Sequence, residues 1–138
     1  LAFFLMANSV SAEIKTNDCW VKEPVAGSSN TAIFLSFTNT GDKDVMVTSV
    51  TTPAAKMADF HTIKHNNGVV SMVPLGHIVV PAKGKTELKM GGKHVMLMGL
   101  KNKLYSGDWV DVEFKLSDGS RINREIEVQN SQQNSMGM

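Results

Sequence analysis

The sequence predicts an all-β protein, a sandwich or barrel of short antiparallel strands. Apolar and polar residues alternate with a period of two over several short stretches, most clearly over residues 109–116, WVDVEFKL. Turn signals such as Asn67-Gly68 and Asp118-Gly119 separate these stretches. Between residues 13 and 128, no stretch shows the apolar spacing of a strong amphipathic helix. These three observations together are typical of a β-sandwich or barrel.

The first half of the chain supplies strands separated by clear turns. Residues 31–44 alternate before a Gly-Asp turn, with apolar side chains at Ile33, Leu35 and Phe37. Residues 44–50 form the next strand, which Thr52-Pro53 ends. Residues 57–75 contain Asn67-Gly68 between two extended runs, and this dipeptide is the strongest short signal of a β-hairpin.

The second half continues the same pattern. Residues 77–90 hold a Pro-Ala-Lys-Gly turn, and residues 91–100, GGKHVMLMGL, form one strand between glycine breaks. Residues 109–128 form a hairpin around Asp118-Gly119. Its first strand turns one face to a core and the other to water, with the core face made by Val110, Val112, Phe114 and Leu116.

Length and charge restrict the class of protein. A chain of 138 residues is most simply one domain, long enough to bury a core without disulfides. The formal net charge is +1, and the 14 basic and 13 acidic residues are scattered along the chain. This distribution provides no basic surface for nucleic acid, so we expect no nucleic-acid partner.

The chain divides into three parts. Residues 1–12, LAFFLMANSVSA, are apolar, then small, and end in an A-x-A-like cleavage pattern, so we interpret them as a signal-peptide remnant. An N-terminal strand or a buried apolar arm is the alternative. Residues 13–128 form the β domain, and residues 129–138 form a polar, loose tail. The apolar run is too short to span a bilayer, so we expect an exported chain that does not insert into the membrane.

Sulfur is present almost entirely as methionine, with nine methionines and one cysteine, Cys19. A single cysteine cannot form an internal disulfide, and thioethers tolerate oxidising surroundings, so this usage fits export. The residues before Cys19, Thr16-Asn17-Asp18, are polar where a lipoprotein signal needs small apolar residues. We therefore do not expect a lipid anchor at Cys19, and interpret it as a buried free thiol.

Two segments carry nearly all the candidate ligands. In an extended strand His94, Met96 and Met98 share one face, because alternate side chains point the same way. In the expected hairpin, His61 and Met72 come close to opposite one another across the turn. If the two segments pack together, His61, Met72, His94 and Met96 form a cluster of two imidazoles and two thioethers.

Such a donor set selects a soft ion. Hard ions such as Mg²⁺ and Ca²⁺ prefer oxygen, and Zn²⁺ prefers thiolate, imidazole and carboxylate. Cu(I) is the ion for which a thioether is a good partner. Methionine needs no deprotonation, so only the imidazoles would make binding pH-dependent. Neutral ligands leave the charge of the ion uncompensated, which suits a carrier that must release it.

The spacing of these residues resembles that of the periplasmic copper chaperone family PCuAC. Its motif is a histidine, ten residues, a methionine, twenty-one residues and then His-x-Met, and His61, Met72 and His94-Val95-Met96 match it completely. Residues 19–42, 81–104 and 107–120 are also similar to the family. The resemblance covers nearly all of residues 14–128.

The resemblance implies a cupredoxin-like Greek-key β-sandwich or barrel that binds copper outside the usual blue-copper site. It implies His61, Met72, His94 and Met96 as ligands of Cu(I), with Cu(II) as a second state. It also implies a periplasmic chaperone, not an enzyme, that delivers copper to an acceptor such as the CuA subunit of cytochrome c oxidase. We expect a monomer.

The chain departs from the family in two places. Family members commonly carry a methionine shortly after the first histidine, where this chain has His61-Thr-Ile-Lys-His65. His65 is therefore either an extra donor, one favouring Cu(II), or a solvated residue beside the turn. A second copper site, which some relatives have in a Met/His-rich tail, has only Met136 and Met138 to support it here.

The remaining candidates are interpreted as structural. We expect Met46, Met57 and Met90 to fill the core, Met98 to be a packing neighbour or a sulfur at the rim, and His77 to be exposed on an edge strand. Asp59 could orient the imidazole of His61 without binding the metal itself. Two other functions stay open: a copper redox protein with Cys19 as a ligand, and a metal-free β-sandwich interaction module with a methionine-rich surface.

Overall fold

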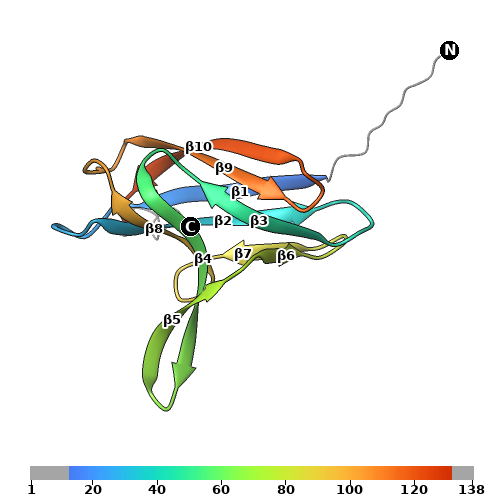
Figure 1. Ribbon diagram of the computed structural model, residues 1–138, viewed down its shortest axis with the longest axis horizontal. Coiled ribbons are helices and arrows are strands. Elements are labelled where there is room, and N and C mark those ends of the chain that lie inside the picture. The colour runs from blue at the N-terminus through green and yellow to red at the C-terminus, as the bar shows by residue number, and fades with distance from the viewer. Residues whose placement is uncertain (1–12, 132–138) are drawn as a thin grey trace.

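The computed structural model describes residues 13–131 of the chain (Figure 1). The interpretation of residues 1–12 as a signal remnant lies outside the described residues, and so does most of the tail expected at 129–138. In the described part of the chain, no helix is long and apolar enough to cross a membrane.

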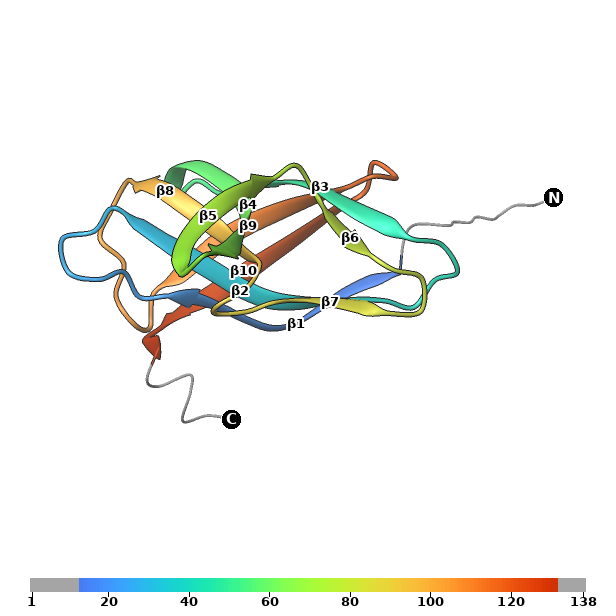
Figure 2. The ribbon, with the colours of Figure 1, turned by 90° about the horizontal axis from the view of Figure 1, so that it is seen from below.

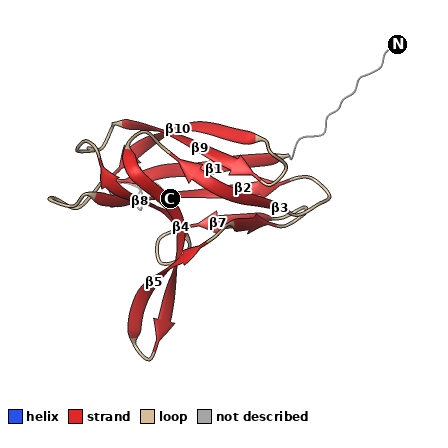
Figure 3. Cartoon of the chain, viewed as in Figure 1, coloured by secondary structure: helices blue, strands red, loops and turns tan. Residues whose placement is uncertain are grey.

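Strands account for the regular elements from Ile14 to Gln129, as Figure 3 shows in red. They are β1 (Ile14–Lys22), β2 (Asn30–Asn39), β3 (Val45–Thr51), β4 (Ala55–Asn66), β5 (Val69–Leu75), β6 (Ile78–Val80), β7 (Lys85–Leu88), β8 (His94–Leu100), β9 (Trp109–Leu116) and β10 (Arg121–Gln129). The predicted all-β class is confirmed.

The strands follow the order β5-β4-β8-β2-β1-β10-β9-β3-β6, with β7 paired to β2 beyond the end of β8. This path folds over into two layers, one from β5 to β1 and the other from β10 to β6 (Figures 1 and 2). A short parallel pairing of Val21 with Val128 joins β1 to β10. Most neighbours in the sheet are not consecutive in sequence, as Greek-key connections require.

The core lies between the two layers. Phe37 of β2 meets Phe114 of β9 edge to face, with ring centroids 5.2 Å apart. Val95 and Leu97 of β8 are completely buried on the same side, as the alternation of that strand predicts. The neighbouring residues His94 and Met96 therefore point to the opposite, outer face of their layer.

The β4–β5 hairpin extends away from the two layers (Figure 1). Asn67 and Gly68 form its turn with positive φ angles of 53° and 81°, the conformation that twists two strands together correctly. Asn66 pairs with Val69 across this turn, which sets the register of the whole hairpin. The expected hairpin at Asn67-Gly68 is confirmed.

The Pro81–Gly84 turn connects the two layers rather than two adjacent strands. β6, before the turn, pairs with β3 in one layer, whereas β7, after it, pairs with β2 in the other. The N–H of Gly84 donates to the carbonyl of Pro81 at 3.0 Å and closes the turn. This crossover brings the chain to β8, and so positions His94 beside β4.

Candidate metal centre

A row of aromatic and imidazole rings crosses the outer face of the first layer. Ring centroids lie 5.0 Å apart for Trp20 and Phe34, 6.3 Å for Phe34 and His94, and 6.0 Å for His94 and His61. The row runs over β1, β2, β8 and β4, because Trp20 pairs with Phe34 and His94 pairs with His61 across their strands. Phe34 and His94 each follow or precede the paired residues Ile33 and Val95 directly, which brings their rings together. Trp20, Phe34 and His94 are all buried, although they lie outside the main core.

The two histidines at the end of this row are direct partners. His61 of β4 is opposite His94 of β8 in the antiparallel register, and their rings stand at 69° to each other. A metal–imidazole bond is roughly 2 Å long, so two rings whose centroids are 6.0 Å apart leave room for one ion between them. The sequence predicted that these segments would meet, and the β4–β8 pairing brings them together.

The ring nitrogens of this pair are unusual in their hydrogen bonding. Nδ1 of His94 lies 3.0 Å from the carbonyl oxygen of Gly92. A carbonyl can only accept, so Nδ1 carries the proton and Nε2 of His94 keeps a free lone pair. Nε2 of His94 and Nδ1 of His61 are both buried and have no hydrogen-bond partner. Buried polar atoms are nearly always paired, so these two nitrogens fit the role of metal donors.

The thioethers of Met96 and Met72 lie on either side of the histidine pair. Met96 follows His94 by two residues, shares its face, and pairs with Asp59. Met72 pairs with Ile63, while Pro74 occupies the position opposite His61. The sequence placed His61 and Met72 close to opposite one another. In the structure they lie on the same face but are shifted by two residues in the β4–β5 register, so they are diagonal neighbours.

A pocket of about 420 Å³ opens beside the histidine pair. Three predicted ligands, Met72, His94 and Met96, contribute to its wall, together with Phe34 and Ile63. His61 is not part of this wall, and it reaches the cluster through its contact with the ring of His94. The structure thus brings all four predicted residues to one place, with three of them around a shared space.

Exposure increases from His94 toward the sulfurs, and His61 is half-buried like Met96. His94 is 3% exposed, Met96 is half-buried, and Met72 is 51% exposed. The nitrogen donors therefore lie at the base of the site, and the thioether of Met72 lies at its mouth. A molecule that enters this pocket would meet this sulfur before it met the imidazole of His94.

A metal site here would have to use sulfur. Among residues 13–131, no three His, Cys, Asp or Glu side chains lie close enough together to hold an ion. The histidine pair supplies two donors of that kind, and Met72 and Met96 are the sulfur donors that share the pocket wall with His94. Thioethers favour Cu(I) over zinc, calcium or magnesium, which is the selectivity that the sequence predicted.

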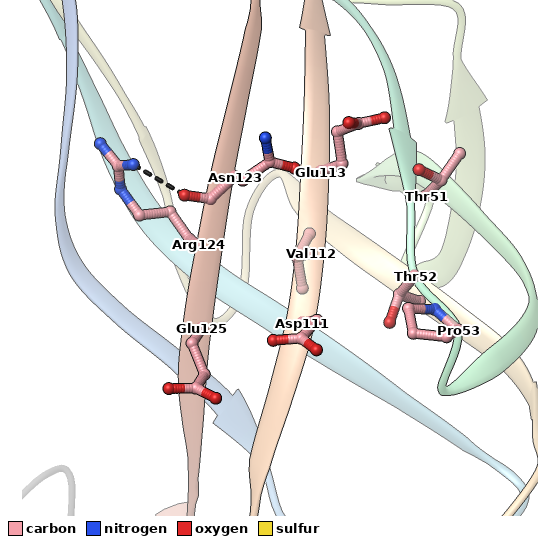
Figure 4. Close-up of a pocket in the computed structure, with 9 residues that line it drawn as sticks. All are labelled: Thr51, Thr52, Pro53, Asp111, Val112, Glu113, Asn123, Arg124 and Glu125. Carbon is pink, nitrogen blue, oxygen red and sulfur yellow. Dashed lines mark hydrogen bonds between the residues drawn. The ribbon is translucent and has the colours of Figure 1, made fainter.

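A larger pocket, of about 610 Å³, lies on β9, β10 and residues 51–53 (Figure 4). Its charged side chains include Asp111, Glu125 and Arg124, and no imidazole or sulfur lines it. The guanidinium of Arg124 donates to the carbonyl of Asn123 at 2.8 Å and to the hydroxyl of Thr16 at 2.7 Å. Its donors are those preferred by hard ions, so this pocket does not compete as a site for a soft metal.

Three methionines are placed differently from the prediction. Met46, Met57 and Met90 are 38%, 56% and 51% exposed, so the interpretation of them as core residues is wrong. Met46 and Met57 lie on strands whose inward positions are taken by other residues, such as Val47 and Ala58. Met90 lines the pocket with Met72 and Met96, and sequence reasoning missed it. Its position four residues before His94, at a Gly-Gly turn, was the available signal.

The other candidates lie around the cluster. Asp59 is exposed, and Nδ1 of His61 has no hydrogen-bond partner, so Asp59 does not orient His61 through that nitrogen. His65 is exposed near the hairpin tip, opposite Val70, and Met98 is half-buried opposite Met57. Neither lines the pocket. His77 is exposed immediately before the edge strand β6, as predicted.

Cys19 is a half-buried free thiol on β1 and packs against the core. Burial raises the pKa of this thiol, an effect that the hydrogen bond with Thr16 partly offsets. Its side chain does not contribute to the pocket that Met72, His94 and Met96 line. The interpretation of Cys19 as a packed free thiol is confirmed, in a half-buried rather than fully buried position.

The chain matches a known protein family over most of its length. The family model described as "LpqE-like: Putative lipoprotein LpqE-like" matches residues 14–128. The chain belongs to the LpqE-like family. A relative from Leifsonia xyli subsp. xyli (strain CTCB07), "Putative lipoprotein Lxx21020", is 36% identical over 108 residues, which are 78% of this chain. The LpqE-like chain spans 64% of the length of that relative.

Solved structures similar to this LpqE-like protein are PCuAC domains. The Cu(I) form of DR1885 from Deinococcus radiodurans has a TM-score of 0.69 and 29% identity, over 84% of this chain and 77% of that one. The copper-bound PCuAC domain of PmoF2 has a TM-score of 0.72 and 16% identity, over 91% and 99%. The apo PCuAC domain of PmoF1 gives 0.73 and 19%, over 86% and 94%.

These findings confirm the resemblance to the PCuAC family and the cupredoxin-like fold. Two of the similar structures carry copper, the PCuAC domain of PmoF2 and the Cu(I) form of DR1885. PCuAC copper chaperone domains are non-enzymatic, in agreement with the expectation that the chain catalyses no reaction.

Proposed function

We propose that this LpqE-like protein is an exported copper carrier that binds one Cu(I) ion through His61, Met72, His94 and Met96. The observation that carries the proposal is the pair of buried imidazole nitrogens without partners, in rings 6.0 Å apart. Leaving two such nitrogens unpaired costs folding free energy, and an ion that accepts both lone pairs removes that cost. The neighbouring thioethers select a soft ion.

The order of burial supports transfer by stepwise ligand exchange. Met72 lies at the mouth and is 51% exposed, whereas His94 is 3% exposed. A donor of the acceptor protein would displace Met72 first, and the buried imidazole of His94 would release the ion last. All four ligands are neutral, so no protein charge has to be separated from the ion during transfer.

The compartment and acceptor follow from the same proposal. The family and the Leifsonia relative are both described as lipoproteins, which supports a location in the cell envelope. In this reading the protein works in the periplasm as a monomer and delivers copper to a site with stronger ligands, such as the CuA subunit of cytochrome c oxidase. The thiolates of such an acceptor would bind Cu(I) more tightly than thioethers and draw it from the carrier.

An anaerobic Cu(I) competition titration against a chromophoric chelator tests the site. The protein should bind one equivalent, and Met72→Leu and Met96→Leu should each weaken binding by at least about tenfold. Met98→Leu is the matched control, because Met98 shares the face of Met96 but lies outside the pocket. Equal losses in all three variants, or no saturable binding in the parent protein, would contradict the proposal.

A further inference from the structure

We propose that Met90 is a further thioether ligand of the copper site, which holds the ion at the mouth of the pocket. The inference rests on the proposed function and adds a donor that lies outside the four matched positions. Met90 lines the same pocket as Met72, His94 and Met96. It is the third methionine of that wall.

The turn that carries Met90 has a defined shape. It connects Leu88, the end of β7, to His94, the start of β8. The N–H of Lys89 donates to the carbonyl of Lys93, and the N–H of Gly92 donates to the carbonyl of Lys89, both at 3.0 Å. Gly91 has a φ of +85°, a conformation that glycine adopts without strain. The backbone on both sides of Met90 is therefore held in place.

The same turn also orients a primary ligand. The carbonyl of Gly92 accepts the Nδ1 proton of His94 at 3.0 Å, which leaves Nε2 free for the metal. Met90 and His94 are thus parts of one short structural unit, and both face the pocket. A change in the turn would affect the donor nitrogen and the third sulfur together.

Packing does not account for Met90. Its side chain is 51% exposed, the same fraction as that of Met72. Met57 is similarly exposed, at 56%, yet it lies outside the pocket, so exposure alone is not the argument. The distinguishing feature of Met90 is an exposed thioether in the same pocket as a buried imidazole that has a free lone pair. In that position a soft, neutral sulfur is chemically competent to bind Cu(I).

A fifth donor has a clear use in a carrier. Two imidazoles and three thioethers are more donors than a single Cu(I) ion holds at once, so Met90 and Met72 can exchange at the mouth while the histidines keep the ion. Copper would enter and leave through this pair of exposed sulfurs. Loss of Met90 should weaken binding on the order of tenfold, less than loss of a histidine.

Methyl NMR of the full chain with ¹³C-methyl methionine tests the assignment. During an anaerobic Cu(I) titration, we expect the Met90 methyl resonance to shift together with those of Met72 and Met96 and to saturate at the same point. Met57 and Met46 should not move. If Met72 and Met96 shift and Met90 does not, this inference fails and the proposed function stands. If no methionine shows a saturable shift, the proposed function itself fails.

Copper X-ray absorption separates ligation from packing. Met90→Leu is compared with Met57→Leu, since both remove an equally exposed thioether. Both substitutions are made in a Met72→Leu background, where Met90 is the exposed sulfur left in the pocket. There Met90→Leu should reduce both the copper–sulfur contribution to the spectrum and the Cu(I) affinity, whereas Met57→Leu should leave both unchanged. A weaker affinity with an unchanged copper–sulfur contribution would mean that Met90 only packs in the pocket, and would overturn the inference.

Discussion

His61 and His94 are direct cross-strand neighbours on β4 and β8, and each has a buried ring nitrogen without a hydrogen-bond partner. Their ring centroids are 6.0 Å apart. Two unpaired nitrogens at adjacent positions are unfavourable for a protein whose only requirement is to fold. The pair therefore supports the proposed role of these residues in binding a metal ion.

A stability measurement can detect the folding free energy that these unpaired nitrogens cost. His61→Leu removes a buried nitrogen without a partner, so the free energy of unfolding of the copper-free protein should rise by roughly 1 kcal/mol. The same variant should lose the stabilisation that Cu(I) confers on the parent protein. Urea unfolding with and without Cu(I) measures both effects. His65→Leu, at an exposed position on the same strand, is the control and should change neither. A destabilised His61→Leu that still gained stability from Cu(I) would argue against the role of His61.

The nitrogen of His94 that binds copper can be specified. Nδ1 donates to the carbonyl of Gly92, so the metal should bind Nε2. In long-range ¹H–¹⁵N spectra of the imidazoles, Cu(I) should change the resonance of Nε2 while Nδ1 keeps its proton. Loss of the Nδ1 proton on metal binding would show that the turn at Gly92 rearranges, which this geometry does not predict.

Phe34 should influence copper binding although it has no donor atom. Its ring lies 6.3 Å from that of His94 and contributes to the wall of the pocket. Phe34→Leu should loosen the imidazole and weaken Cu(I) binding on the order of tenfold. Phe37→Leu is the matched control, because Phe37 packs on Phe114 in the core, away from the site. Each variant should lose about 1–2 kcal/mol of stability, but only Phe34→Leu should lose affinity. Chelator competition and urea unfolding separate the two effects.

Cys19 should be dispensable for copper binding. Cys19→Ala should keep the stoichiometry and affinity for Cu(I), and the parent protein with copper should show no intense thiolate absorption band. A band that disappeared in Cys19→Ala would instead support a copper redox protein.

The thiol also makes a small pH-dependent contribution to stability. Burial raises the pKa of Cys19 in the folded state, so folding favours the protonated thiol. This contribution is fully present below the ordinary thiol pKa of about 8.5 and is lost as the pH rises through the folded pKa. Relative to Cys19→Ala, the parent protein should therefore lose stability at alkaline pH. Unfolding curves at neutral and alkaline pH measure the difference, and an unchanged difference between the two proteins would contradict it.

Local pattern was sufficient for most of the fold and for part of the site. Alternation along residues 109–116 predicted which side chains are buried, and the Asn67-Gly68 dipeptide predicted the protruding hairpin. Both depend on interactions between near neighbours in sequence. The shared face of His94 and Met96 likewise follows from the period of a single strand. The spacing of His61, Met72, His94 and Met96 also predicted the family correctly.

Other features depended on the register between strands that are distant in sequence. The sequence alone determined that His94 and Met96 share a face, and that a thioether-rich cluster would suit a soft ion. Only the tertiary structure decided that β8 pairs with β4 so that His94 faces His61, that Met72 is diagonal to His61, and that Met90 lies at the mouth of the pocket. The reason is that a shift of one residue turns a side chain to the opposite face, and the packing of the whole sandwich, including the crossover at Pro81–Gly84, sets that register.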